Sequence, residues 1–282
     1  MKKKLPLILL IFFILLIAVG VYGVVRARRS AKSDARIQTT SSRVSKRADG
    51  SYDSSRYLTV KLPSGLQSIM KDYEGFTVSF NPENRTPNYV VWELLGSETE
   101  GDAARYNKFW QDEELIACPS TYDYSYSGYD RGHLCPAADQ KWSDQAMVDC
   151  FSLANIAPQD HDLNTGAWKT LENKERAWAQ RDSAIIIIAG PIYSESDQER
   201  IGDAEVRVPG AFFKVLAAPF LDKPRGIAFV YPNMTAPGNM QQYSMTIRDL
   251  EKIVGFNFFS DLTQEEQDRL ETTASFNEWN RR

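Results

Sequence analysis

The residues best suited to chemistry surround the first of two histidines in this 282-residue sequence. His133 ends the run Asp130-Arg131-Gly132-His133. A neutral imidazole can act as a general base near neutral pH, and a guanidinium presents a planar pair of donors to phosphate or carboxylate. Gly132 permits a close approach of the backbone beside the ring. Residue types alone leave two interpretations open, a catalytic histidine and a structural, hydrogen-bonded one.

A second segment, from Ser152 to Asn164, contains several amide and carboxylate side chains. Their oxygens suit a hard cation or a set of ordered waters. The second histidine, His161, lies in this segment between Asp160 and Asp162. No other histidine or cysteine lies at a zinc-like spacing from it. We therefore interpret His161 as a residue of a loop or of the rim of a site, and not as a zinc ligand.

Residues 164–180 are predicted to form a helix, and four of them recur at intervals of four: Asn164, Trp168, Glu172 and Arg176. These positions form one stripe that drifts by about 40° per step. The stripe could direct an amide oxygen, a carboxylate and a guanidinium to one site. It could equally be an exposed face with a Glu172–Arg176 pair, which contributes only about 0.2–0.5 kcal/mol.

The three cysteines, Cys118, Cys135 and Cys150, are too few for a disulfide framework. Two arrangements are open. All three are buried thiols, or Cys150 forms one bridge with Cys118 or Cys135 in an oxidising compartment. Cys135 lies two residues after His133, and we interpret it as a small packed side chain and not as a catalytic thiol.

The elements that must position these residues are predicted to be several strands and two helices. Apolar patterns predict strands at 76–80, 89–95, 151–156, 184–189, 212–217 and 226–231. A second helix is predicted at 246–254, with Ser244 as its N-cap. The connections are irregular and often long, which favours an α+β fold over a regular βαβ alternation.

Charge is distributed unevenly along the chain, although the net charge is only −4. Residues 1–55 carry 11 Lys/Arg and 3 Asp/Glu, a balance of +8, which leaves −12 for the remainder. A content of 43% hydrophobic and 25% charged residues excludes a wholly disordered chain, a collagen-like chain and a polytopic membrane protein. Because the acidic body repels polyanions, any polyanion site on it must be a local basic patch.

Residues 1–29 are predicted to be a signal anchor or a signal peptide that brings the chain to a membrane. The uncharged run from Leu7 to Val25 would span about 28 Å as a helix, close to the thickness of a bilayer core. We favour an uncleaved anchor, because this run is long for a signal peptide. Residues 30–56 are predicted to be a flexible basic tether and 57–282 the folded domain. The expected protein is membrane-anchored with an extracytoplasmic catalytic domain, or secreted.

Three motifs stand in order along the chain. They are Asp130-Arg131-Gly132-His133, then Asn155-Ile156-Ala157-Pro158-Gln159, then Leu163-Asn164-x-x-Ala167-Trp168-x-x-Leu171-Glu172. In this order they resemble the DNA/RNA non-specific endonuclease family, most clearly over residues 128–181 and more loosely over 70–260. The resemblance implies an α+β fold with a central, mainly antiparallel sheet flanked by helices, and a ββα-metal active site.

The resemblance also implies a role for each matching position at the metal. His133 would be the general base that activates water. Asn164 would be the sole direct protein ligand of a hydrated Mg²⁺, for which Mn²⁺ could substitute. Glu172 would hold the waters of the metal, and Asn155 and Gln159 would organise the surrounding site.

Phosphate contacts are implied in the same way. Arg131 and Arg176 would contact phosphate or the charge of the transition state. The family uses a further upstream arginine, for which Arg105 is our candidate and Lys108 its competitor. Asp130 is expected to fix the local backbone and not to react.

The implied function is a metal-dependent endonuclease that hydrolyses DNA and RNA, leaving 5′-phosphate and 3′-hydroxyl ends. Weak sequence preference is expected, because such chemistry reads phosphates and not base edges. The alternative is a membrane-anchored nucleic-acid receptor that captures DNA with little or no cleavage. The complete set of His133, Asn164 and Glu172 argues against pure binding. A phosphodiesterase for small nucleotides is a third interpretation, and it would need a closed pocket.

Overall fold

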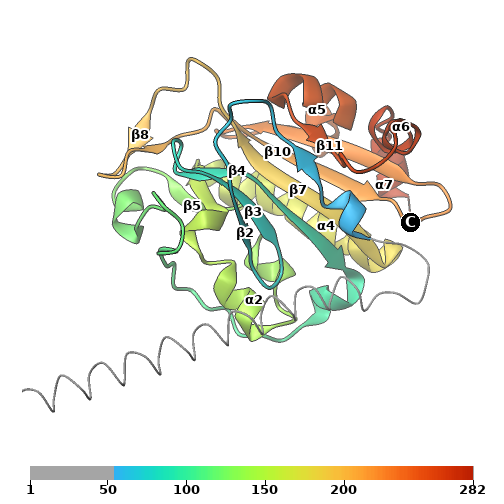
Figure 1. The fold of residues 1–282 in the computed structure, drawn as a ribbon. Coiled ribbons are helices and arrows are strands. Elements are labelled where there is room, and N and C mark those ends of the chain that lie inside the picture. The colour runs from blue at the N-terminus through green and yellow to red at the C-terminus, as the bar shows by residue number, and fades with distance from the viewer. Residues whose placement is uncertain (1–53, 282) are drawn as a thin grey trace, which may run out of the picture. The chain divides into compact units, whose positions relative to one another are not determined.

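The computed structural model describes residues 54–281, which are built around a seven-stranded antiparallel sheet (Figure 1). The predicted segments 1–29 and most of 30–56 lie outside the described residues. The strand order is β12-β11-β10-β7-β4-β3-β2. The strands are β2 (Ile69–Asp72), β3 (Thr77–Asn81), β4 (Thr86–Leu95), β7 (Ala184–Ile192), β10 (Ala211–Ala218), β11 (Arg225–Pro232) and β12 (Ser244–Met245). The predicted α+β fold with a mainly antiparallel sheet is confirmed.

Helices cover both faces of this sheet. Side chains of adjacent residues on a strand point to opposite faces, so Phe212 and Phe213 of β10 belong to two different apolar clusters. The cluster around Phe212 includes side chains of α4 (Lys169–Asp182) and α7 (Phe276–Asn280). The cluster around Phe213 includes side chains of α5 (Ile247–Val254) and α6 (Gln264–Glu271). The central strands are therefore buried on both sides.

Short elements complete the described part of the chain. Three two-stranded pairs lie outside the main sheet: β1 (Val60–Lys61) with β13 (Asn257–Phe258), β5 (Asp130–His133) with β6 (Ile156–Gln159), and β8 (Arg200–Ile201) with β9 (Val206–Arg207). Helix α2 (Asp144–Asp149) lies between β5 and β6 in the sequence. Single 3₁₀ turns are η1 (Ser54–Tyr57), η2 (Gly96–Glu100), η3 (Thr121–Tyr124), η4 (Ala137–Asp139), η5 (Leu153–Asn155) and η7 (Met240–Tyr243).

Two predicted elements differ from the structure in their local geometry. Half of the segment 151–156, predicted as a strand, forms the turn η5, which Ser152 caps by accepting a hydrogen bond from the Ala154 backbone N–H at 3.2 Å. Helix α5 is capped by Thr246 and not by Ser244, which lies in β12. The Thr246 hydroxyl accepts from the Asp249 backbone N–H at 3.0 Å, as an N-cap does.

The predicted helix at 164–180 is longer and less regular than expected. It begins as α3 (His161–Leu163), where the Asp160 carboxylate caps the Leu163 backbone N–H at 3.1 Å. A π-helical turn η6 (Asn164–Trp168) follows before the chain continues as α4. Single π turns within helices occur frequently at functional sites. This turn contains Asn164, the predicted metal ligand.

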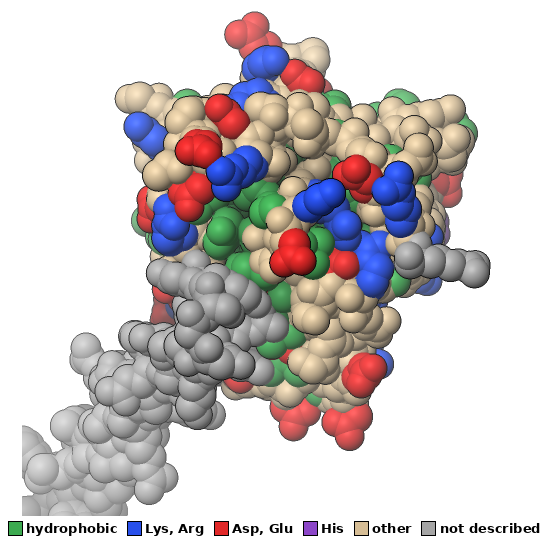
Figure 2. Space-filling view, turned by 90° about the vertical axis from the view of Figure 1, so that its right-hand side faces the viewer, with side chains coloured by type: hydrophobic (Ala, Val, Ile, Leu, Met, Phe, Trp, Pro, Cys, Tyr) green, Lys and Arg blue, Asp and Glu red, His purple; other side chains and the backbone are tan. Residues whose placement is uncertain are grey.

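The surface toward the C-terminal end mixes both signs of charge. Figure 2 shows Lys/Arg and Asp/Glu side chains interspersed on the face that forms the right-hand side of Figure 1. Within α5 and α6, for example, Arg248 pairs with Glu251 at 3.2 Å and with Asp268 at 2.8 Å. Cations and anions on this face therefore offset one another locally.

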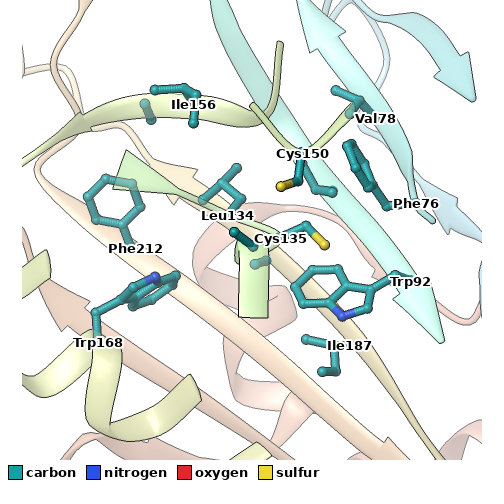
Figure 3. Close-up of a cluster of buried hydrophobic side chains, with 14 of the residues drawn as sticks. Phe76, Val78, Trp92, Leu134, Cys135, Cys150, Ile156, Trp168, Ile187 and Phe212 are labelled. Carbon is teal, nitrogen blue, oxygen red and sulfur yellow. The ribbon is translucent and has the colours of Figure 1, made fainter. Parts of the chain in front are cut away.

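The core holds the β5–β6 pair against the main sheet. Figure 3 shows Leu134 and Cys135, which directly follow β5, in one cluster with Ile156, Trp168 and Phe212. Each of these side chains is at most 1% exposed. Burial of one large apolar side chain contributes about 1.5–3 kcal/mol, so this cluster fixes the position of β5 relative to the helix that follows β6.

All three cysteines are free thiols and all three are buried, so the structure contains neither of the two bridges considered above. Burial raises the pKa of the Cys118 thiol to about 12 and also raises the pKa of Cys135 and Cys150. These thiols are therefore protonated at neutral pH and pack as small apolar side chains.

Candidate active site

Two strands and a helix form the frame of the candidate site. Strand β5 runs antiparallel to β6, and α3, η6 and α4 follow directly after β6. Gly132 lies opposite Ala157, and a Cβ atom at Gly132 would lie 2.5 Å from the Gln159 side chain. Only glycine allows this approach. Arg131 and His133 are two residues apart on β5 and therefore lie on the same side of the strand.

His133 packs against two phenylalanine rings, Phe109 and Phe151, which also contact each other with their centroids 5.1 Å apart. Its ring centroid is 5.2 Å from that of Phe109 and 4.9 Å from that of Phe151, which it meets edge to face. The Nε2 atom is buried and has no hydrogen-bond partner within residues 54–281. Burial, followed by the positive charge of Arg105, lowers the pKa of His133 to about 3. The imidazole is therefore neutral at physiological pH, with a nitrogen lone pair available to accept a proton.

Two arginines converge on the same aromatic pair. The Arg105 guanidinium lies 5.0 Å from the Phe151 ring centroid, and the Arg131 guanidinium lies 5.5 Å from that of Phe109. Arg131 donates from Nη2 to the Thr121 carbonyl at 2.8 Å, while its buried Nε has no partner in the described part of the chain. The structure thus brings Arg105 and Arg131, two of the three predicted phosphate-binding arginines, to the surroundings of His133.

Asn164 is oriented by Asp130, a residue that we expected from the sequence only to fix the local backbone. The Asn164 amide donates from Nδ2 to Asp130 Oδ2 at 2.8 Å, and His161 Nδ1 lies 2.9 Å from the same oxygen. This hydrogen bond uses the amide nitrogen of Asn164, and no described residue donates to its amide oxygen. Asp130 therefore acts through its side chain, and it leaves free the Asn164 atom that could bind a cation.

Asn155 and Gln159 differ in how their amides are used. The Asn155 oxygen accepts from the Cys135 backbone at 2.9 Å, and its nitrogen donates to the carbonyls of Cys135 and Cys150. This buried side chain clamps the segment that follows His133. Gln159 is also buried, but neither its Oε1 nor its Nε2 has a partner within the described range. Its amide remains available to a ligand.

The sequence allowed Glu172 and Arg176 of α4 to pair with each other, but in the structure each has another ion-pair partner. Arg176 donates from Nη1 to Asp139 at 2.7 Å and from Nη2 to Asn173 at 2.6 Å. It therefore points to a buried aspartate, and the phosphate contact assigned to it stays a prediction. Glu172 Oε1 lies 3.9 Å from Lys214 Nζ. Burial raises the pKa of Glu172 to about 7, although the charge of Lys214 opposes this.

Lys214 lies beside Glu172 in the structure, but the sequence did not identify it as a candidate site residue. It is 0% exposed, and its Nζ lies 2.9 Å from Glu175 Oε2, which is also fully buried. The available signal was a single charged residue in the apolar run Phe212-Phe213-Lys214-Val215-Leu216 of β10. Nothing in the local pattern indicated that Glu172 and Glu175 of α4 would meet it.

The donor set suits a hydrated cation with few protein ligands. Within residues 54–281, no group of three or more His, Cys, Asp and Glu side chains is placed to hold a metal ion. The oxygen donors that remain are the unpartnered amides of Asn164 and Gln159 and the carboxylate of Glu172. Mg²⁺ keeps several waters and is commonly bound through one or two protein oxygens. These residues therefore fit such an ion.

Comparisons with known proteins show the family of this chain. The family model for DNA/RNA non-specific endonuclease matches residues 53–265. Human mitochondrial endonuclease G is 32% identical over 68% of this chain and 70% of its own length. A chain in the crystal structure of the EndoG/EndoGI complex superimposes with a TM-score of 0.65 at 28% identity, over 70% of this chain and 88% of that chain. The chain belongs to the DNA/RNA non-specific endonuclease family.

A second group of relatives is longer than the region that it shares with this chain. The mitochondrial nuclease EXOG of Xenopus laevis is 32% identical over 69% of this chain and 59% of its own length. Human EXOG is 32% identical over 67% of this chain and 56% of its own length. The chain thus spans less than two thirds of these two relatives.

The predicted location is contradicted by these relatives. The EXOG and endonuclease G proteins are named as mitochondrial nucleases, and not as membrane-anchored or secreted ones. The expectation of a membrane-anchored or secreted protein came from the apolar run at 7–25, which lies outside the described residues. Within 54–281, no helix is both long and apolar enough to span a bilayer.

Proposed function

We propose that this chain is a metal-dependent endonuclease that cleaves DNA and RNA with little sequence preference and leaves 5′-phosphate and 3′-hydroxyl ends. The observation that carries the proposal is that His133 has a neutral ring and a buried ring nitrogen, Nε2, without a hydrogen-bond partner in the described chain. The names of the endonuclease G and EXOG relatives support the same class of activity.

His133 is the general base in this proposal. Its Nε2 accepts a proton from a water molecule, whose oxygen attacks the phosphorus atom. The rings of Phe109 and Phe151 hold the imidazole in one orientation and keep it in its neutral form. Arg105 and Arg131 bind the non-bridging phosphate oxygens and place the phosphorus near the imidazole.

Asn164 would hold a hydrated Mg²⁺, or Mn²⁺ in its place, through the amide oxygen that Asp130 leaves free. Glu172 would accept hydrogen bonds from the waters of the ion, and Gln159 offers an amide beside them. When bound, the ion would neutralise phosphate charge and stabilise the leaving 3′ oxygen. Because Arg176 donates from Nη1 to Asp139 and from Nη2 to Asn173, we assign it to positioning the α4 side of the site.

Digestion of supercoiled plasmid and of ribosomal RNA by the full chain tests this function. We expect nicking and fragmentation of both substrates with Mg²⁺ or Mn²⁺ and none with EDTA. The competing function is capture of nucleic acid without cleavage. Retarded migration of intact plasmid, with no fragments under any metal condition, would establish capture and exclude the endonuclease.

A further inference from the structure

A lysine is buried beside the candidate site and belongs to none of the three sequence motifs. Lys214 lies at the middle of β10, opposite Ala189 of β7 and Phe229 of β11. Its ammonium lies 4.6 Å from the Trp168 ring centroid and 5.8 Å from that of Trp92. The lysine is thus held on a central strand with its charged group surrounded by side chains of the core.

Two glutamates of one helix face share this ammonium. Glu175 Oε2 lies 2.9 Å from Lys214 Nζ, and Glu172 Oε1 lies 3.9 Å from it. Residues three apart on a helix lie on the same face, so one cation on β10 reaches both carboxylates. The Glu175 contact is the closer one and anchors the ammonium. The Glu172 contact is longer and leaves that carboxylate able to accept other hydrogen bonds.

Arg176, the other cation near this face, is hydrogen-bonded to a different carboxylate, although its charge also acts to lower the pKa of Glu172. Arg176 pairs with Asp139 at 2.7 Å, and the Trp92 indole N–H donates to the other oxygen of Asp139 at 3.2 Å. Among the described residues, Lys214 is therefore the cation within ion-pair distance of Glu172. Burial raises the pKa of Glu172, Glu175 and Asp139, and the positive charge of Lys214 opposes this at each of the three.

We propose that Lys214 is a positioning residue, whose buried ammonium holds the Glu172 carboxylate in place toward the waters of the bound metal ion. This inference rests on the proposed function, because it gives Glu172 the role assigned there. Lys214 touches neither substrate nor metal and acts through Glu172 alone. A purely structural Lys214–Glu175 pair would stabilise the packing of α4 on β10 without affecting the metal.

The test compares Glu175→Gln with the double variant Lys214→Met/Glu175→Gln. The single variant removes the anchoring charge but leaves Lys214 beside Glu172. The double variant replaces both partners by neutral side chains of similar length, so that neither is buried as an unpaired charge. Comparing these two variants therefore isolates the effect of the ammonium on Glu172.

Two readouts are needed, and one of them requires no catalysis. Binding of Mn²⁺ to the full chain without nucleic acid is followed by the electron paramagnetic resonance signal of the free ion. Cleavage of plasmid gives kcat and KM. We expect Glu175→Gln to bind Mn²⁺ within about threefold of wild type, and the double variant to bind it about 10-fold more weakly or worse. The double variant should lower kcat and leave KM for plasmid unchanged.

A matched control separates this effect from loss of stability. Arg248→Met breaks the 2.7 Å ion pair with the fully buried Glu271 on α6, which packs on the opposite face of the sheet. This variant should unfold at a lower temperature and keep the Mn²⁺ affinity of wild type. If Arg248→Met weakens Mn²⁺ binding as much as the double variant does, the loss reflects general destabilisation and the proposal is overturned.

The Glu172→Gln background decides whether Lys214 acts through Glu172. Adding the double substitution to Glu172→Gln should not weaken Mn²⁺ binding further. Wild-type affinity in the double variant, or a full additional loss in the Glu172→Gln background, would overturn the proposal. If the wild-type chain binds Mn²⁺ but cleaves nothing, the proposed endonuclease fails, while the Mn²⁺ comparison still decides the role of Lys214.

Discussion

At the scale of single residues, the candidate site is defined by polar atoms that the fold buries without a partner. The unpartnered atoms of His133, Arg131 and Gln159 lie in or beside the β5–β6 pair. A buried polar atom without a hydrogen bond lowers stability, and unpaired groups of this kind concentrate where a ligand supplies the missing partner. Their grouping supports a site for a polar ligand around β5.

The first prediction concerns the base. His133→Ala should reduce cleavage by about 10²–10⁴-fold, the usual contribution of a general base. Initial rates of plasmid nicking measure this, and circular dichroism checks that the variant is folded. Added imidazole should restore part of the activity, because the substitution leaves a space beside Phe109 and Phe151 that the His133 ring filled. Nicking within tenfold of wild type would rule out His133 as the base.

The second prediction concerns pH and Glu172. Its pKa is about 7 in the folded chain, against an ordinary value of 4.5. Folding therefore favours the protonated form, and the stability from this group is present below about pH 4.5 and is lost as the pH rises through about 7. Only the ionised form accepts hydrogen bonds at both oxygens, so Mn²⁺ affinity should fall as the pH drops below about 7.

Glu172→Gln is the control for that pH dependence. Its Mn²⁺ affinity should be weak and nearly constant between about pH 5.5 and pH 8, because the titrating group is gone. The same decline in the variant as in wild type would assign the titration to another group. His133 cannot account for it, since its pKa of about 3 lies below this range.

At the scale of elements, the site depends on how closely β5 approaches β6 and on where the following helix begins. Gly132 permits that approach, and Asp160 caps the helix immediately after β6. The π turn from Asn164 to Trp168 then changes the direction of the side chains within the helix. Trp168 points into the core and donates to the His133 carbonyl at 3.3 Å, which links helix and strand.

The third prediction tests whether the site needs β5 and β6 to lie this close together. Gly132→Ala places a Cβ atom 2.5 Å from the Gln159 side chain. The strands must separate, which should lower the free energy of unfolding by about 1–3 kcal/mol and reduce cleavage more than stability alone explains. Gly166→Ala is the matched control, because a Cβ atom there meets nothing within 4 Å. Denaturant unfolding measures the free energy of unfolding of both variants. Equal values for Gly132→Ala and Gly166→Ala would contradict this interpretation.

At the scale of the whole molecule, charge limits how nucleic acid can bind. The sequence after residue 55 carries a balance of −12. Cations and anions alternate on the face shown in Figure 2. Attraction for a polyanion must therefore come from a few local cations, chiefly Arg105 and Arg131. We expect modest affinity that depends strongly on salt.

The fourth prediction follows from this small number of contacts. Arg105→Ala should weaken binding of a catalytically inactive His133→Ala chain to DNA and reduce the slope of log affinity against log salt by about 1. Fluorescence anisotropy at several salt concentrations measures the slope. Arg248→Ala, on α5, should leave it unchanged. A slope that is unaffected by Arg105→Ala would remove this residue from the phosphate contacts.

The sequence predicted the fold class and the family better than it predicted the local structure around the candidate site. The three motifs named His133, Asn164 and Glu172 because chemistry restricts which residue types can occupy such positions. The pattern at 151–156 misled, because one serine hydroxyl converts an alternating segment into a turn. Arg176 donates to a buried aspartate 37 residues away in the sequence, a contact that no local pattern indicated, and its phosphate contact stays a prediction.

By itself, the sequence determined the fold class, the family and the kinds of atoms available for catalysis. Those depend on residue types and on spacings within short segments. Only the tertiary structure decided which atoms are left without partners and which charges meet. The Lys214–Glu175 contact joins residues 39 apart in sequence, and the Asp130–Asn164 contact joins residues 34 apart. Such contacts form because burial of apolar faces brings distant segments together, and no local pattern encodes them.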